Sequence, residues 1–83
     1  MLPPEDMIND YGHSFIGEKQ FTKACQLFQM NVENYPNSYK VYDACGDYFI
    51  AISDKAKAAA YFKKALSLKE NPESRKKFNE LAQ

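Results

Sequence analysis

The chain has 83 residues, of which 45% are hydrophobic, 14% aromatic and 27% charged. Eleven Lys and Arg residues balance eleven Asp and Glu residues, and this neutrality argues against a general nucleic-acid binder because it gives no strong attraction for phosphates. The length fits one domain, and no apolar run approaches the roughly 20 residues that a membrane span needs.

Two amphipathic helices are predicted in the first half of the chain, over residues 4–17 and 21–34. The apolar stripe of the first helix recurs at i, i+3, i+4 and i+7, which is the spacing of one helix face. Its members are Ile8, Tyr11, Gly12 and Phe15. In the second helix, Ala24 is followed four residues later by Phe28. A small residue beside a large one suits close packing against a neighbouring helix.

Two more helices are predicted over residues 38–51 and 54–69. The segment Pro36-Asn37-Ser38 separates them from the first pair, and either Asn37 or Ser38 is placed to cap the third helix. Ser53-Asp54 is placed in the same way to cap the fourth helix. No segment of the chain favours a strand, so the predicted class is all-α.

A fifth helix is predicted over residues 72–82. Its start, Asn71-Pro72-Glu73, provides a cap, a first-turn proline and an acid near the helix N-terminus. Phe78, Leu81 and Ala82 form a short apolar stripe on an otherwise polar helix, and such a helix covers the open end of a helical stack. The run Arg75-Lys76-Lys77 has an alternative interpretation as a phosphate or nucleic-acid patch, although the chain as a whole carries no net charge.

The sequence repeats itself with a period of 34 residues. The identical pairs are Gly12 with Gly46, Phe15 with Phe49, Ile16 with Ile50, Lys23 with Lys57, Ala24 with Ala58, Phe28 with Phe62 and Asn37 with Asn71. A fixed period of roughly 20 to 50 residues is the signature of a stacked-repeat architecture. Glycine inside a helix costs about 1 kcal/mol relative to alanine. Its recurrence therefore predicts that a neighbouring helix comes too close for a Cβ atom.

This pattern of Gly, Phe, Ala and Phe resembles the tetratricopeptide repeat, a helix–turn–helix unit. The resemblance implies two repeats, over about residues 5–38 and 39–71, and a capping helix over about 72–83. Together they would form a right-handed α-solenoid fragment of five helices. The packing positions that it implies are Gly12, Phe15, Ala24, Phe28, Pro36, Gly46, Phe49, Ala58, Phe62 and Ala65.

The resemblance also implies a concave groove lined by the first helix of each repeat. The groove residues would be Asn9, His13, Ile16, Lys40, Asp43, Asp47 and Ile50. Ile16 and Ile50 either anchor a bound peptide or pack against a neighbouring helix. Family members that grip the C-terminal carboxylate of chaperones use Lys, Asn and Arg in this groove. Asp43 and Asp47 would repel such a carboxylate, so we expect no clamp of that kind.

No catalytic, metal or cofactor site is indicated. His13, the single histidine, is expected on the solvent side of the first helix, and Cys25 and Cys45 fall at core positions. Asp43 and Asp47 lie one helical turn apart, as a paired-carboxylate site requires, but we expect only Lys40 and ordinary helix beside them, with no second acid or histidine cluster. The sequence has no glycine-rich phosphate loop and no metal-ligand spacing. We therefore expect a protein that is not an enzyme and takes no cofactor.

The expected function is a non-catalytic interaction or scaffold module. Two repeats and a cap fall below the roughly three units that usually stabilise such a stack. The N-terminal face, with Leu2 and Met7, is therefore expected to pack on a partner protein or peptide, on a second copy as a homodimer, or on a preceding domain. We expect neither nucleic acid nor membrane as a partner, and a soluble protein of the cytoplasm or periplasm.

A narrower resemblance concerns the segment Asn31–Ser38, Val41-Tyr42-Asp43 and Gly46-Asp47. These residues are similar to the tetratricopeptide tail that follows the catalytic domain of some bacterial serine esterases, and Lys69–Arg75 fits the end of such tails. The resemblance implies that the chain is the C-terminal part of a longer protein. No Gly-x-Ser-x-Gly elbow is present, so it implies no esterase activity here. A free-standing peptide receptor is the other alternative.

Overall fold

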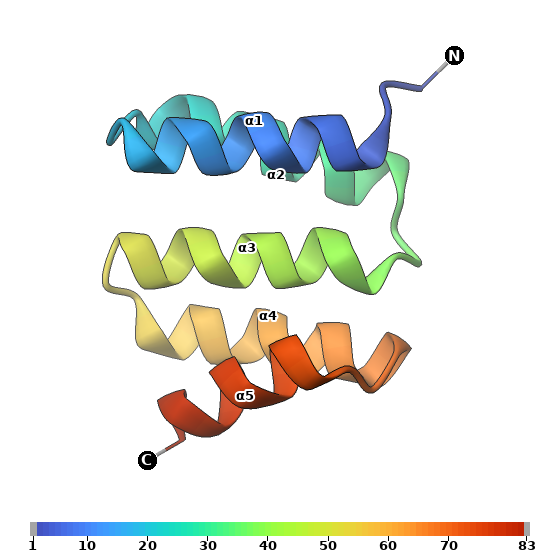
Figure 1. Cartoon of the computed structure of the whole chain (residues 1–83), viewed down its shortest axis with the longest axis vertical. Helices are drawn as coiled ribbons and strands as arrows, with labels where there is room; N and C mark the ends of the chain where they lie inside the picture. Colours follow the sequence, from blue (N-terminus) through green and yellow to red (C-terminus); the bar gives the residue numbers. More distant parts are fainter. Residues whose placement is uncertain (1, 83) are drawn as a thin grey trace.

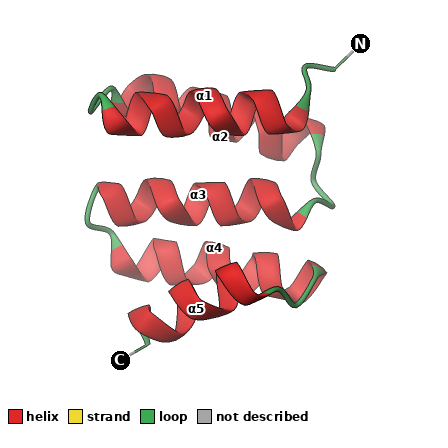
Figure 2. Ribbon diagram, in the orientation of Figure 1, coloured by secondary structure: helices red, strands yellow, loops and turns green. Residues whose placement is uncertain are grey.

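The computed structural model describes residues 2–82. Over this range the chain forms five α-helices and no strand (Figure 2). They are α1 (Glu5–Gly17), α2 (Phe21–Asn34), α3 (Tyr39–Ala51), α4 (Lys55–Leu68) and α5 (Pro72–Leu81). The all-α class is confirmed, and each predicted boundary lies within one residue of the observed one. None of these helices has the length and apolar character needed to cross a membrane.

The helices are arranged as two stacked hairpins. Figure 1 shows α1 and α3 in one layer, with α2 and α4 behind them and α5 crossing in front of α4. Each hairpin packs internally, and the second hairpin contacts the first through α3, which touches both α1 and α2. The stack measures 37 × 27 × 16 Å. The first hairpin and α5 therefore form its two opposite ends.

The turn inside each hairpin has the same backbone geometry. Lys19 and Ser53, which lie 34 residues apart, both adopt a left-handed conformation with φ of 60° and 65°. The closing backbone hydrogen bonds are Gln20 N to Phe15 O and Asp54 N to Phe49 O, both 2.8 Å. The sequence period is thus a structural period as well.

In each hairpin, an aromatic ring of the second helix packs against a glycine of the first helix. A Cβ atom on Gly12 would lie 2.4 Å from the Phe28 ring, and one on Gly46 would lie 2.5 Å from the Phe62 ring. Phe28 and Phe62 are 2% and 0% exposed, so neither ring has room to move away. The predicted close approach is confirmed, and its cause is the buried ring.

The remaining structural repeat positions differ in how deeply they are buried. The alanines are fully buried: Ala24, Ala58 and Ala65. Phe15 and Phe49 are half-buried, and the Phe49 ring stacks on Tyr61 with 5.3 Å between centroids. Pro36 is exposed in the turn between the hairpins.

The helix starts show where local sequence decides the structure. Asp54 accepts a hydrogen bond from the Lys57 amide at 3.1 Å, and Asn71 accepts one from the Ser74 amide at 2.9 Å, so both predicted caps are confirmed. Ser38 occupies the N-cap of α3 but makes no capping bond. Its hydroxyl donates instead to the Glu5 carboxylate at the start of α1, because the stacking of α3 on α1 brings that acceptor within reach.

Candidate functional site

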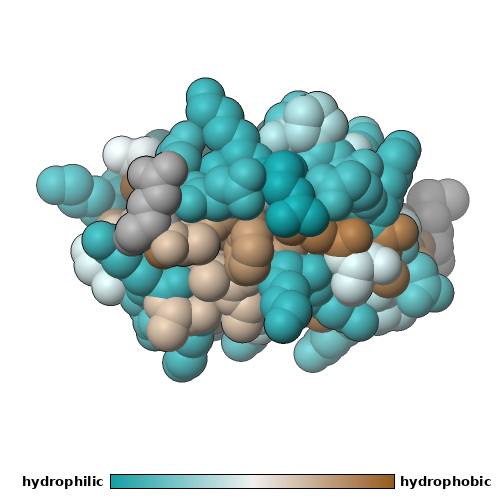
Figure 3. All heavy atoms as spheres, turned by 90° about the horizontal axis from the view of Figure 1, so that it is seen from below, coloured by the Kyte–Doolittle hydropathy of each residue, from teal (hydrophilic) through white to brown (hydrophobic). Residues whose placement is uncertain are grey.

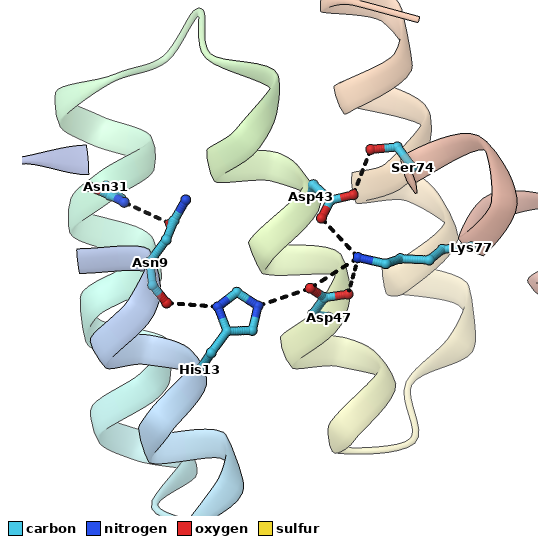
Figure 4. Close-up of polar contacts among 7 residues, drawn as sticks. All are labelled: Asn9, His13, Asn31, Asp43, Asp47, Ser74 and Lys77. Atoms are coloured by element: carbon cyan, nitrogen blue, oxygen red, sulfur yellow. Dashed lines mark hydrogen bonds and ion pairs between the residues drawn. The ribbon is translucent and has the colours of Figure 1, made fainter. Parts of the chain in front are cut away.

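A polar network runs across the face formed by α1, α3 and α5 and reaches α2 (Figure 4). Its members are Asn31, Asn9, His13, Asp47, Lys77, Asp43 and Ser74. Two of its contacts, His13 with Asp47 and Asp43 with Lys77, join residues 34 positions apart. Such residues become neighbours because successive front helices repeat the same placement.

His13 joins α1 to α3. Its Nδ1 lies 2.7 Å from the Asn9 carbonyl oxygen, and its Nε2 lies 2.9 Å from Asp47 Oδ2. Both partners are acceptors, so the geometry fits an imidazolium that donates from both nitrogens. The hydrogen bond with Asp47 raises the pKa of His13 and outweighs the opposing effect of burial. His13 is exposed, as predicted, but it forms a contact between the hairpins.

Lys77 joins α5 to α3. Its Nζ lies 3.0 Å from Asp43 Oδ1 and 3.0 Å from Asp47 Oδ1, and the Ser74 hydroxyl donates to Asp43 Oδ2 at 2.6 Å. Burial lowers the pKa of Lys77, but the hydrogen bonds and charges of Asp47 and Asp43 outweigh burial and raise it. Burial likewise raises the pKa of Asp47, while hydrogen bonds from His13 and Lys77 lower it below its usual value.

These contacts correct the expectation for the two aspartates. Asp43 and Asp47 were expected to have Lys40 beside them, with no acid or histidine cluster, and to repel a carboxylate ligand. Their side chains are instead 14% and 24% exposed, and both carboxylates form ion pairs with Lys77. The physical reason is that α5 places a cation at the position that follows Asp43 by one period. That spacing was the signal by which the sequence could have identified Lys77.

Asn31 was not predicted to have a role. It is 1% exposed, and its Nδ2 donates to the Glu5 carbonyl at 3.0 Å and to Asn9 Oδ1 at 2.8 Å. Its Oδ1 has no hydrogen-bond partner within residues 2–82. A polar residue on an amphipathic helix usually faces water, which is why periodicity alone does not single it out.

A groove of about 290 Å³ lies beside the network, between α1, α3 and the start of α5. Its lining consists of Asp6, Asn9, Asp10, His13, Tyr39, Lys40, Asp43, Ala44 and Glu73. The structure thus brings Asn9, His13, Lys40 and Asp43 together along this groove. Asp47 does not line the groove. Ile16 packs against the core and Ile50 is 43% exposed, so the packing alternative describes Ile16.

Apolar side chains are exposed at the α1 end of the stack. Met7 and Tyr11 are 47% and 54% exposed, whereas Val41 and Cys45, one period later, are 0% and 5% exposed. Tyr11 was expected on the buried stripe of α1, and this is wrong. Cys45 is covered because α3 stacks on the first hairpin, whose Ala24 and Phe28 belong to the same core cluster. Within residues 2–82 no helix stacks on α1 in the same way.

The opposite end is not uniformly polar. Seen from the α5 end, an apolar strip runs between hydrophilic borders (Figure 3). The helices that form this end, α4 and α5, contain half-buried apolar residues: Ala59, Leu66, Phe78 and Leu81. The predicted cap therefore covers this end only in part.

The surroundings of His13 and Cys45 limit the reactivity of both side chains. Both nitrogens of His13 are engaged, so neither is free to accept a proton from a nucleophile. Burial raises the pKa of the Cys45 thiol to about 12, with a smaller contribution from the nearby Cys25. The thiol is therefore protonated and unreactive at neutral pH. Within residues 2–82 no cluster of His, Cys, Asp and Glu could hold a metal ion.

The comparisons with known proteins assign no family. No family model matches the chain, and no curated protein or solved structure matches it significantly. Function is therefore inferred from the geometry alone. Two surface features stand out in that geometry, the exposed apolar end at α1 and the polar groove between α1 and α3.

Proposed function

We propose that the chain is a non-catalytic protein-interaction module of the tetratricopeptide type, which docks through the α1 end of its stack. The observation that carries the proposal is the contrast between equivalent positions. Val41 and Cys45 are 0% and 5% exposed, while Met7 and Tyr11 are 47% and 54% exposed. Exposed apolar surface of this kind marks sites of protein contact, and Met and Tyr are enriched there.

The repeat type is supported by features that recur after 34 residues. Each hairpin has a left-handed residue in its turn, at Lys19 and Ser53, and a glycine that faces a buried phenylalanine ring. These features follow from packing within the hairpin, so they support the fold assignment without indicating any partner. In the accessory-tail alternative, the same α1 end docks on the catalytic domain of an esterase.

The groove supports a second candidate, a receptor for a peptide. Four carboxylates, those of Asp6, Asp10, Asp43 and Glu73, line it together with Lys40. This excess of negative charge suits a basic segment and disfavours a carboxylate. We rank this candidate second because two of the carboxylates already have a cation beside them. Asp43 forms an ion pair with Lys77, and Lys40 Nζ lies 3.8 Å from Asp6 Oδ1.

Affinity capture with matched variants tests the proposal. Met7→Gln/Tyr11→Gln removes the apolar surface of the α1 end, and Ile50→Gln/Ile52→Gln removes two exposed isoleucines elsewhere, which are 43% and 38% exposed. We expect the first pair to lose the proteins captured by the wild type and the second pair to retain them. Far-UV circular dichroism should show equal helix content in all three, because every substituted side chain is exposed.

Three outcomes would count against the proposal. Unchanged capture by Met7→Gln/Tyr11→Gln would contradict docking at α1. Loss of capture in Ile50→Gln/Ile52→Gln alone would place docking at the C-terminal end of α3 instead. Hydrolysis of an activated ester by the purified chain, abolished by His13→Ala, would contradict a non-catalytic role.

A further inference from the structure

We propose that protonation of His13 locks the first hairpin onto α3 and thereby fixes the width of one end of the groove. Figure 4 shows the His13 side chain extending from α1 across the gap to Asp47 of α3. The lock goes beyond the proposed function, because it concerns the face formed by α1 and α3 and not the exposed α1 end. It follows from the surroundings of the imidazole ring and from the places where the other contacts between α1 and α3 lie.

Both ring nitrogens of His13 face hydrogen-bond acceptors, the Asn9 carbonyl oxygen at 2.7 Å and Asp47 Oδ2 at 2.9 Å. The imidazolium donates to both oxygens, whereas neutral imidazole carries a hydrogen on only one nitrogen. With that hydrogen on Nδ1, the Nε2 lone pair points at the Asp47 carboxylate. With it on Nε2, the Nδ1 lone pair points at the Asn9 carbonyl oxygen, and the contact with Asp47 is no longer an ion pair. Loss of the proton therefore weakens the connection between α1 and α3 in either tautomer.

The charged groups around His13 lie on three helices. The Asp47 carboxylate of α3 favours the imidazolium, and the Lys77 ammonium of α5 opposes it. Two further carboxylates line the same groove, Asp10 on α1 and Asp43 on α3. The hydrogen bond with Asp47 outweighs burial and raises the pKa of His13 above 6.5. The lock therefore holds at pH values below the raised pKa and is released as the pH rises through it.

The other polar contacts between α1 and α3 lie near the opposite end of the groove. The Ser38 hydroxyl, at the start of α3, donates to the Glu5 carboxylate at the start of α1. Next to it, Lys40 Nζ lies 3.8 Å from Asp6 Oδ1, and both of these side chains are more than half exposed. His13 is the single histidine of the chain, so the connection that responds to pH near neutrality lies at the end of the groove towards the C-termini of α1 and α3.

The apolar core between the hairpins does not depend on the proton of His13. Ala24 and Phe28 of α2 belong to the same buried cluster as Cys45 of α3, and Val32 packs against it. From α2, the uncharged Phe28 ring also contacts the His13 ring edge-on, with 5.3 Å between centroids. These contacts remain when His13 is neutral, so the hairpins stay stacked. The first hairpin then pivots about this core, because only its polar connection at one end of the groove has been released.

The second hairpin and α5 remain joined over the same pH range. Lys77 Nζ lies 3.0 Å from Asp43 Oδ1 and 3.0 Å from Asp47 Oδ1. Burial lowers the pKa of Lys77, but the hydrogen bonds and charges of the two aspartates outweigh burial and raise it above 10.5. Lys77 is therefore still charged when His13 loses its proton. The movement should be confined to α1 and α2 relative to a body formed by α3, α4 and α5.

Residual dipolar couplings of the backbone amides test the lock, because they report how helices are oriented relative to one another. Imidazole nitrogen chemical shifts, measured in the same samples, give the pKa of His13. Below that pKa, we expect the couplings of all five helices to fit one rigid arrangement. Above it, those of α1 and α2 should depart from that arrangement while those of α3, α4 and α5 still share it. Unchanged orientations on both sides of the pKa, or a pKa at or below 6.5, would overturn the inference.

Three variants identify the group that is responsible. His13→Gln removes the titrating ring, so its helix orientations should not change with pH. Asp47→Asn removes the carboxylate charge, so His13 should titrate at lower pH and the reorientation should follow the new pKa. Lys40→Met is the matched control, because it removes the contact with Asp6 in the same groove and should keep the pH response of the wild type. A pH-dependent reorientation of His13→Gln equal to that of the wild type would overturn the inference.

Amide hydrogen exchange gives the size of the effect. After correction for the intrinsic pH dependence of exchange, protection in the C-terminal half of α1 should fall about two- to fivefold as the pH rises through the pKa of His13, which is the range expected for a partly exposed ion pair. Protection in α5 should stay constant, because Lys77 remains charged. Equal losses in α1 and α5 would indicate a general loosening and contradict the lock. Docking at the α1 end is tested separately by the capture experiment.

Discussion

The two hairpins have the same interior at equivalent positions. The first holds the Phe28 ring against Gly12, and the second holds the Phe62 ring against Gly46 with nearly the same spacing. Each hairpin also contains one fully buried alanine one turn before that phenylalanine, at Ala24 or Ala58. The packing within a hairpin is therefore set by its own residues.

Their outer faces differ. Val41 is 0% exposed in the second hairpin, whereas Met7, at the equivalent position of the first, is 47% exposed. Both residues are apolar, so side-chain chemistry does not explain the contrast. The difference shows that burial of the outer stripe depends on the neighbour that stacks against it, and the following substitutions test how far the two hairpins are equivalent.

The largest effect is expected from removing the buried rings. Phe28→Ala and Phe62→Ala should each reduce the free energy of unfolding by about 3–5 kcal/mol, because each leaves a cavity against its glycine. Urea denaturation followed by far-UV circular dichroism measures this. A difference between the two losses larger than about 2 kcal/mol would exceed the usual scatter for such sites and contradict the equivalence of the hairpins.

Filling the glycine positions should cost less. Gly12→Ala and Gly46→Ala should each destabilise the protein by about 1–3 kcal/mol, since overpacking against a buried ring outweighs the better helix propensity of alanine. Gly17→Ala is the control, because nothing lies within 4 Å of its added Cβ atom. If Gly46→Ala were as stable as this control, the close approach would have no energetic importance.

Removing the cation of the polar network tests how the second hairpin is joined to α5. Lys77→Met should lower the free energy of unfolding by about 1–2 kcal/mol, because it leaves Asp43 and Asp47 without their shared charged donor. Lys76→Met, on the exposed side of the same helix, should have almost no effect. Equal losses in both variants would show that the network contributes nothing.

Substitutions at the helix N-caps should lower the stability of the protein at one position and raise it at another. Asp54→Ala should cost about 1 kcal/mol, because the capping bond to the Lys57 amide is lost. The equivalent residue of the first hairpin, Gln20, makes no capping bond, so Gln20→Asp should stabilise the protein by about 0.5–1 kcal/mol. Thermal unfolding measures both. A Gln20→Asp variant with a lower Tm would show that the two turns are not interchangeable.

The smallest effect concerns pH. Since the folded protein raises the pKa of His13 above 6.5, the His13–Asp47 contact stabilises fully below that value and is lost as pH rises through the raised pKa. Because His13 is half exposed, the loss should be less than about 1 kcal/mol. His13→Gln should remove this pH dependence. An unfolding free energy of the wild type that rises between pH 6 and pH 9 relative to His13→Gln would contradict the assignment.

The predictions from sequence succeeded where the cause is local. Helix boundaries followed from spacing and caps, and Asp54 and Asn71 form the expected capping bonds. Ser38 shows the limit of such reasoning. Its hydroxyl can cap α3 or reach another acceptor, and the stacked hairpin supplies Glu5, so the outcome depends on residues far away in the chain.

The sequence by itself determined the helices, their pairing into hairpins and the close helix contacts at the two glycines, because the side-chain spacing repeats every 34 residues. Only the tertiary structure decided that His13 contacts Asp47 and that Lys77 compensates Asp43. The tertiary structure also decided that Tyr11 is exposed and that α5 covers its end of the stack only in part. Contacts between hairpins depend on how rigid helices are placed against one another, and burial at the ends depends on what is present to cover them.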